Sequence, residues 1–239
     1  MRRQNYLFPG YPIIQDEDFF KLSQDSVILG SFGRLRKGEK LLDIGCGIGV
    51  LLMIMLIRSP EAVGAGVEIT EGAAELASEN LKLCGLENRG TILHSDMRLL
   101  DKQLYGSFDV CVSNPPYFAP SRGYTSTKDA IAAARNESCG NISDVCLTAC
   151  NALKWGGRLY LCYPPERMAA LFSSLAQNRL EPKVMRLVHP SEGHAPCLVL
   201  IEARKGGGEG LCVMPPLFIK KCGEKTEEFK QIYMLEDTK

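Results

Sequence analysis

A short motif near the middle of the chain, Asn114-Pro115-Pro116-Tyr117, carries groups that suit a planar ligand with an exocyclic amine. Asn114 offers a carboxamide oxygen, Pro115 offers a carbonyl that no helix can engage, and Tyr117 offers a flat aromatic face. Two successive prolines remove two backbone donors and fix two φ angles, so neither a helix nor a paired strand continues through them. The motif is therefore a rigid turn. Its alternative role is a plain strand-to-loop turn whose aromatic ring packs on its own domain.

The run before this motif, Phe108 to Ser113, is apolar and typical of a buried strand. In open α/β sheets, ligands bind beyond the carboxyl ends of the strands. The motif is therefore expected at the ligand-binding edge of a sheet.

A glycine-rich turn, Asp43 to Gly49, lies between an expected strand and an expected helix that starts at Val50. Glycines let the backbone approach a ligand closely, and the helix N-terminus supplies free N–H groups. A dinucleotide-binding fingerprint would need glycine where this chain has Val50, and the P-loop lysine is missing. Asp43 suits a ligand with a cationic amino-acid end and would repel a pyrophosphate, which disfavours a nicotinamide oxidoreductase. The candidate contacts in this turn are Asp43, Gly45, Cys46, Gly47 and Gly49.

Two further acids follow the next two expected strands. Glu68, beside Ile69, stands about twenty residues after the glycines, where a carboxylate accepts both hydroxyls of a ribose. Asp96, beside Met97, can accept a hydrogen bond from an adenine amino group. Singly, each acid could equally be a helix cap or a solvated loop residue. Three acids at the ends of three consecutive strands indicate a ligand with an ammonium, a ribose and an adenine.

Strands alternate with helices along most of the chain, which implies a doubly wound, mostly parallel α/β sheet covered on both faces. The expected strands are 41–44, 62–69, 91–94, 108–113, 158–163, 183–188 and 197–203. Only His189 to Pro196 separates the last two strands, which is too short for a helical crossover. The fold class expected is therefore a seven-stranded sheet whose last strand is antiparallel.

The chain has 239 residues, 45% hydrophobic and 23% charged, which suits one large domain with appendages. We expect an N-terminal arm and short brace helix in residues 1–38, the main domain in 39–205, and a glycine linker with a packed tail in 206–239. The arm is predicted to pair Tyr11–Gln15 with Phe19–Leu22 as a hairpin. Net charge is zero, so any polyanion partner would need a local basic patch.

Ten cysteines are present without paired C-x-x-C spacing, so they are interpreted as free thiols in a reducing cytosol. No metal site is expected. Leu51 to Ile57 is strongly apolar but too short to cross a bilayer, and no stretch of signal length follows the N-terminus. The expected location is the cytoplasm, without a membrane partner.

Together these residues resemble a class I S-adenosylmethionine-dependent methyltransferase. Asp43 to Gly49 resembles the first motif of that family, Glu68 its ribose-binding acid, and His94-Ser95-Asp96-Met97 its adenine-binding loop. An antiparallel seventh strand is a hallmark of its fold. The resemblance covers roughly Leu41 to Ala203 and implies S-adenosylmethionine as the cofactor, with S-adenosylhomocysteine as its product.

Asn114 to Tyr117 resembles the fourth motif of methyltransferases that modify planar amino nitrogens, namely adenine N6, guanine N2 and the glutamine amide of release factors. Three other segments are similar to bacterial adenine-N6 methyltransferases that act on the anticodon loop of valine tRNA: Phe20–Leu29, Ala134–Glu137 and Pro215–Ile219. The chain departs from them at Asn136, where they commonly carry histidine. The resemblance implies methyl transfer to adenine N6 in RNA, with a tRNA as partner.

The chemistry expected is mainly positioning. An exocyclic amine is a poor nucleophile because its lone pair is delocalised into the ring. Asn114 and the Pro115 carbonyl would accept its two N–H bonds while Tyr117 stacks on the base, which aligns the nitrogen for attack on the methyl group. The base must leave its stack, which is easiest in an RNA loop.

Three basic residues in or just after the loop behind the motif are candidate phosphate contacts or ordinary solvated charges: Arg122, Lys128 and Arg135.

Glutamine methylation of a release factor is the nearest alternative function, but the residues before Leu41 are too few for a helical recognition domain. Guanine-N2 methylation and a non-catalytic RNA- or protein-binding module also stay open, and DNA methylation lacks a target-recognition segment. The chain is expected to be a monomer or a weak homodimer.

Overall fold

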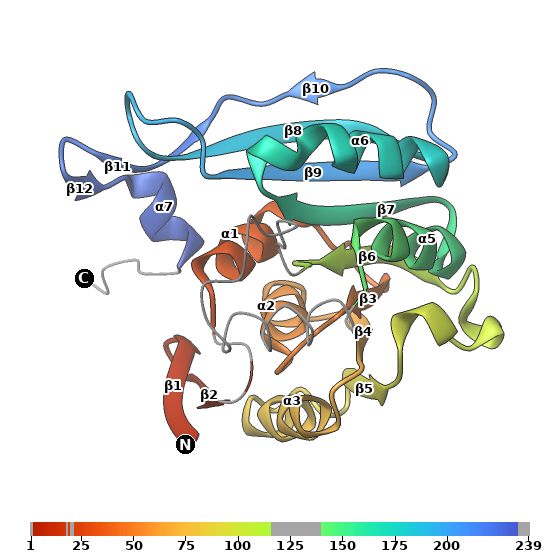
Figure 1. Ribbon diagram of the computed structural model, residues 1–239. Helices are drawn as coiled ribbons and strands as arrows, with labels where there is room; N and C mark the ends of the chain where they lie inside the picture. The colour runs from red at the N-terminus through yellow and green to blue at the C-terminus, as the bar shows by residue number, and fades with distance from the viewer. Residues whose placement is uncertain (1, 18, 20–21, 116–139, 234–239) are drawn as a thin grey trace, which may run out of the picture.

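The computed structural model describes residues 2–17, 19, 22–115 and 140–233, and its centre is one large, mostly parallel sheet (Figure 1). Its strands are β3 (Lys40–Ile44), β4 (Val63–Glu68), β5 (Gly90–His94), β6 (Phe108–Ser113), β7 (Leu153–Tyr163), β8 (Leu180–Ser191), β9 (Leu198–Lys205), β10 (Cys212–Val213), β11 (Leu217–Lys221) and β12 (Glu224–Lys225). Their order is β12-β11-β8-β9-β7-β6-β3-β4-β5, and β10 pairs with β8.

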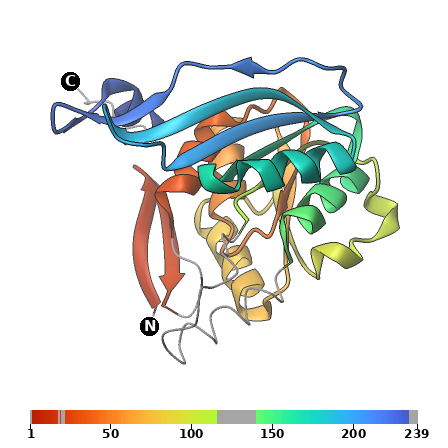
Figure 2. The ribbon, with the colours of Figure 1, turned by 45° about the horizontal axis from the view of Figure 1, so that its top comes forward.

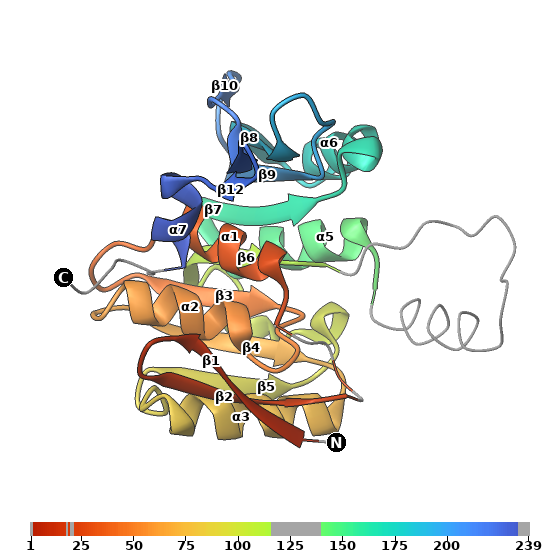
Figure 3. The ribbon, with the colours of Figure 1, turned by 90° about the vertical axis from the view of Figure 1, so that its left-hand side faces the viewer.

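Helices cover both faces of this sheet, as expected for a doubly wound fold. They are α1 (Gln24–Phe32), α2 (Val50–Arg58), α3 (Glu71–Leu83), α5 (Ile142–Ala152), α6 (Met168–Gln177) and α7 (Glu227–Ile232). Figure 3 shows α1 and α2 in front of the central strands. The strands alternate their side chains between two apolar clusters, with Leu41 in the cluster on the α1–α2 face and Leu42 in the cluster on the α5–α6 face. Both faces are therefore buried, which explains the near-continuous apolar runs.

The seventh expected strand is β9, and the structure confirms that it runs antiparallel to both of its neighbours, β7 and β8. The strands β3 to β7 pair in parallel, so their carboxyl ends share one edge. The predicted fold class is thus confirmed.

The C-terminal tail packs on the domain and also widens the sheet beyond the seven strands expected from the sequence. In the tail, β11 pairs in parallel with β8, and β12 pairs with β11 (Figure 2). The outer edge of β8 would otherwise expose unpaired N–H and C=O groups. Leu217 is 1% exposed and joins the core, so the tail closes this edge with apolar burial as well as hydrogen bonds.

The N-terminal arm is a hairpin, but its strands differ from the prediction. In the structure β1 (Arg2–Phe8) pairs with β2 (Tyr11–Asp16), so Tyr11–Gln15 pairs upstream and not with Phe19–Leu22. The turn contains Pro9 and Gly10, and Gly10 has a φ of 84°, which glycine adopts without strain. The Pro-Gly pair is the turn signal that decides the register.

A buried asparagine on α3 ties this hairpin to the glycine turn. Asn80 is 0% exposed; its Oδ1 accepts from the N–H of Ile14 at 2.7 Å, and its Nδ2 donates to the carbonyls of Ile14 and Ile48 at 3.0 and 3.1 Å. One side chain therefore holds three backbone groups from two distant segments.

Replacing this side chain by Asn80→Ala is expected to lower the free energy of unfolding by about 2–3 kcal/mol, because buried backbone groups lose their partners. Urea unfolding followed by circular dichroism measures the loss. Gln177→Ala, which removes an exposed amide from α6, serves as the control. If both variants lose the same small amount, Asn80 does not anchor the hairpin.

Candidate active site

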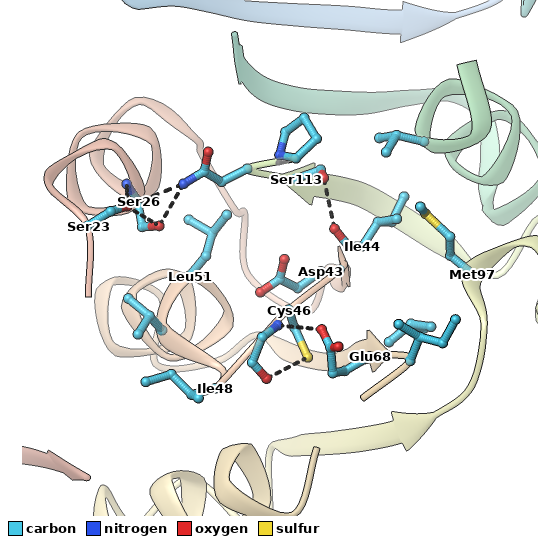
Figure 4. Close-up of a pocket in the computed structure, with 18 of the residues that line it drawn as sticks. Ser23, Ser26, Asp43, Ile44, Cys46, Ile48, Leu51, Glu68, Met97 and Ser113 are labelled. Atoms are coloured by element: carbon cyan, nitrogen blue, oxygen red, sulfur yellow. Dashed lines mark hydrogen bonds between the residues drawn. The ribbon is translucent and has the colours of Figure 1, made fainter. Parts of the chain in front are cut away.

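A cavity of about 390 Å³ opens at the carboxyl ends of β3, β4 and β6. Its walls come from the glycine turn, the ends of β4 and β6, the start of α1, the loop after β5 and Val145 of α5 (Figure 4). Parallel strands bring these segments to one edge although they are far apart in sequence. The candidate residues that line the cavity are Asp43, Gly45, Cys46, Gly47, Glu68, Ile69, Asp96, Met97, Asn114 and Pro115.

Gly49 is the one candidate residue of the glycine turn that does not line this cavity. It is the N-cap of α2 with a φ of 83°, and a Cβ added to it would lie 3.3 Å from the Cβ of Ala77 on α3. Its place is therefore in the packing of α2 against α3. Gly45 and Gly47, with φ values of 72° and 55°, give the turn its left-handed backbone beside the cavity.

Asp43 stands at the centre of the site, 1% exposed. Gly49 has no side chain with which to cap α2, and Asp43 Oδ2 instead accepts from the N–H of Leu52 at 3.0 Å, near the start of that helix. Burial raises the pKa of Asp43 to about 7, the Leu52 hydrogen bond opposes the rise, and the charge of Glu68 adds to it. A buried carboxylate with a raised pKa gains most from a cationic ligand.

Glu68 closes β4 and is 8% exposed. Its Oε2 accepts from the N–H of Gly47 and its Oε1 from the N–H of Thr70, both at 2.9 Å. Figure 4 shows its carboxylate beside Cys46 of the glycine turn. A carboxylate oxygen can accept two hydrogen bonds, so each oxygen keeps capacity for a ligand hydroxyl.

Asp96 follows β5 and caps a short 3-10 turn, Met97–Leu99. Arg98 pairs with its carboxylate at 2.6 Å, and the hydrogen bonds from Arg98 hold the pKa of Asp96 below its usual range. The guanidinium engages both carboxylate oxygens, so a contact between Asp96 and an adenine amine would have to be shared with Arg98. That contact stays a prediction.

Asn114 comes directly after β6, whose last residue, Ser113, donates its hydroxyl to the carbonyl of Ile44 at 2.8 Å and so joins β6 to β3. The Asn114 Nδ2 donates to Ser26 Oγ at 3.0 Å, and its Oδ1 accepts from Cys162 Sγ at 3.1 Å. The adjoining Pro115 lines the cavity as well. Five other predicted site residues lie outside the described residues: Pro116, Tyr117, Arg122, Lys128 and Arg135.

The residues assigned to the site from the sequence did not include Ser23, Ser26 or Cys162, all of which the structure places beside Asn114. Ser23 is the N-cap residue of α1, and its Oγ accepts from the N–H of Ser26 at 3.2 Å. The signal that could have found the pair is the i, i+3 spacing of two serines in the first turn of the brace helix. Cys162 carried no such signal, because it stands inside an apolar strand.

Within the ranges that the structure describes, no group of three or more His, Cys, Asp or Glu side chains is arranged to hold a metal ion. None of the helices in those ranges combines the length and the apolar character that crossing a membrane requires.

Residues 25–164, more than half of the chain, match the model of the methyltransferase small domain family. A protein of Tolumonas auensis named tRNA1(Val) (adenine(37)-N6)-methyltransferase is 29% identical over 84% of this chain and 83% of its own length. Proteins of the same name from Yersinia enterocolitica and Proteus mirabilis are 34% and 32% identical over 51% of this chain. The chain spans about half the length of these two relatives, 49% and 48%.

Solved structures share the fold at low sequence identity. A predicted O-methyltransferase from Agrobacterium tumefaciens has a TM-score of 0.74 and 22% identity, with 88% of this chain and 96% of that chain covered. A ribosomal protein L11 methylase from Lactobacillus delbrueckii subsp. bulgaricus has a TM-score of 0.54 and 16% identity, with 75% and 77% covered. The fold, the site and the family match agree with the class predicted from the sequence: the chain belongs to the methyltransferase small domain family.

Proposed function

We propose that the protein transfers a methyl group from S-adenosylmethionine to the exocyclic N6 of an adenine in RNA, most specifically in the anticodon loop of a valine tRNA. One cavity is lined both by Asp43, Glu68 and the glycine turn and by the Asn114-Pro115 turn, and this observation supports the proposal most strongly. A cofactor site and an amine-binding site that share a cavity can bring methyl donor and acceptor together. The names of the relatives support adenine as the acceptor.

The residues present fit this cofactor. The buried carboxylate of Asp43 suits the ammonium of its amino-acid end, and the carboxylate of Glu68 suits the two ribose hydroxyls. Asp96 and Met97 border the part of the cavity left for the adenine ring. A volume of about 390 Å³ falls within the usual range for small-molecule sites. When bound, S-adenosylmethionine supplies the methyl group from its sulfonium centre.

Asn114 and Pro115 bind the substrate amine by accepting its hydrogen bonds. The carboxamide oxygen of Asn114 and the carbonyl of Pro115 accept the two N–H bonds of the amine and turn its nitrogen toward the methyl donor. Fixing the reacting atoms in this geometry can lower the activation free energy by about 7 kcal/mol or more in well-oriented systems. Methyl transfer would form the N–CH₃ bond as the S–CH₃ bond of the sulfonium breaks, with S-adenosylhomocysteine as the leaving group. The methylated amine would then be cationic and would lose one proton to water. No dedicated base is needed before transfer.

A base in an RNA loop suits this site better than a base in a paired duplex, because a loop base can leave its stack and present its amine at little cost in free energy. The amide of a protein glutamine and the N2 amine of guanine are also planar, and the same two acceptors could hold either. The names of the relatives favour adenine over both.

Incubation with labelled S-adenosylmethionine and three acceptor pools tests this proposal: total tRNA and ribosomal RNA from a strain that lacks this protein, and purified release factors. Label in tRNA alone is the expected result. Label only in release factors would identify a protein glutamine as the substrate. Label only in ribosomal RNA would identify ribosomal RNA as the substrate in place of tRNA. Cofactor binding without label in any pool would contradict the proposed activity.

A further inference from the structure

Two serine hydroxyls from the first turn of α1 reach the side chain of Asn114, which lies far along the chain. Its Nδ2 donates to Ser26 Oγ at 3.0 Å and approaches Ser23 Oγ at 3.4 Å. The two hydroxyl oxygens are themselves 3.0 Å apart. Figure 4 labels Ser23 and Ser26 among the residues that line the cavity and marks their hydrogen bonds with dashed lines. The brace helix thus contacts the amine-binding motif directly.

The Ser26 hydroxyl is not the group that caps α1. Ser23 is the N-cap residue, and its oxygen accepts the N–H of Ser26 at 3.2 Å. Ser31 on the same helix makes the ordinary local contact, in which its hydroxyl donates to the carbonyl of Ile28 at 2.8 Å. The Ser26 hydroxyl instead contacts the Ser23 hydroxyl and the Asn114 carboxamide, and both serines line the cavity.

The orientation of a carboxamide decides what it can bind. Its oxygen end accepts hydrogen bonds and its nitrogen end donates them, and the two ends are nearly equal in size. An amine that donates two N–H bonds needs the oxygen end. A half-turn about the last side-chain bond would present N–H groups to the substrate amine and repel it.

We propose that Ser26, assisted by Ser23, is a positioning residue that fixes which end of the Asn114 carboxamide faces the substrate. Ser23 Oγ accepts the N–H of Ser26 and the hydroxyl hydrogen of Ser26, which leaves a lone pair on Ser26 Oγ for the Asn114 Nδ2. The Oδ1 then points away from α1, on the side where Cys162 Sγ donates to it at 3.1 Å. This inference rests on the proposed function, because it gives Asn114 the role of amine acceptor.

Ser26→Ala is the informative variant, since Ser23→Ala would also remove the helix cap. Ser26→Ala is expected to lower kcat about tenfold with the KM for RNA and the affinity for S-adenosylmethionine unchanged, as for the loss of one hydrogen bond that orients a reacting group. Ser26→Thr, which keeps the hydroxyl, is expected to restore most of kcat. The matched control is Ser31→Ala, which removes a hydroxyl from the same helix without touching the cavity.

A double-substitution cycle with Asn114→Ala separates positioning from a general weakening of the site. If Ser26 acts only through Asn114, Ser26→Ala will cause no further loss of kcat in the Asn114→Ala background. Independent losses that multiply would overturn the inference, and so would a Ser26→Ala variant with kcat within twofold of the wild type.

Neutron crystal structures of the wild-type and Ser26→Ala proteins, in which amide nitrogen and oxygen can be distinguished, give a readout that does not need activity. One carboxamide orientation at Asn114 is expected in the wild type, and a rotated or mixed orientation is expected in the variant. An unchanged orientation would overturn the inference. A wild-type protein that binds cofactor but methylates no RNA would contradict the proposed function alone, while the structures still decide whether Ser26 orients Asn114.

Discussion

Asn114→Ala is expected to remove almost all methyl transfer while the affinity for S-adenosylmethionine stays within about twofold of the wild type. The side chain follows β6 and is only partly buried, and its Oδ1 is one of the two acceptors that we assign to the substrate amine. Loss of one preorganised hydrogen-bonding group at a reacting centre typically costs about 100- to 1,000-fold in kcat. The loss should appear in kcat more than in the KM for RNA, because this contact aligns the nucleophile.

Single-turnover labelling measures the rate for this variant, and isothermal titration calorimetry measures cofactor binding. Asn178→Ala provides the control, because that asparagine follows α6, bonds the carbonyl of Ser174 and does not line the cavity. A rate for Asn114→Ala within about fivefold of the wild type would exclude this side chain as a principal acceptor, since that is far below the cost expected for a preorganised group.

Asp43→Asn is expected to weaken S-adenosylmethionine binding about 100-fold, the usual cost of removing one partner of a buried, hydrogen-bonded charge pair. Asparagine has the same shape, and its oxygen can still accept from the N–H of Leu52, which keeps the start of α2 in place. The variant loses the negative charge that we assign to the cofactor ammonium. Titration calorimetry at pH 8 measures the affinity, and an affinity within fivefold of the wild type would contradict this assignment.

The same substitution should change how stability depends on pH in the cofactor-free protein. Burial raises the pKa of Asp43 from its ordinary value of 3.8 to about 7, so between those pH values the folded state holds a proton that the unfolded state has released. The contribution of Asp43 to stability is therefore present below about pH 4 and is lost as pH rises to about 7. Three pH units set an upper bound of about 4 kcal/mol on this effect.

Asparagine does not ionise, so the variant should not lose stability in this way as pH rises. From pH 5 to pH 8, the unfolding free energy of the wild type should therefore fall relative to that of Asp43→Asn. Urea unfolding of both proteins at pH 5, 6, 7 and 8 measures this difference. Wild-type cofactor affinity should rise over the same range, because the ammonium needs the ionised carboxylate. A stability difference that is independent of pH would show that Asp43 is ionised throughout.

The sequence predicted the parts of the site that are local in the chain. Asp43 and the glycines after it form a spacing that can be recognised within one turn, and Glu68 follows at the end of the next strand. The antiparallel β9 was also predictable, because the short connection after β8 allows no helical crossover. These inferences depend on distances along the chain, which the sequence contains directly.

The contacts that the sequence did not reveal join segments far apart in the chain. The hydrogen bond between Ser26 and Asn114 spans 88 residues, and the bond between Ile14 and Asn80 spans 66. Nothing near an asparagine indicates which distant backbone it will satisfy. The pairing of β11 with β8 was missed for the same reason, since a short apolar segment does not specify which sheet edge it will join.

The atom that receives the methyl group decides directly whether Asn114 and Pro115 hold an adenine N6 amine. Valine tRNA without modifications would be methylated with the purified protein, digested to nucleosides and analysed by mass spectrometry against authentic standards. N6-methyladenosine is expected as the single new nucleoside, and it should be absent when Asn114→Ala replaces the wild type. A methyl group on guanine N2, or on adenine at a position other than the exocyclic amine, would contradict the proposed holding of the N6 amine by Asn114 and Pro115.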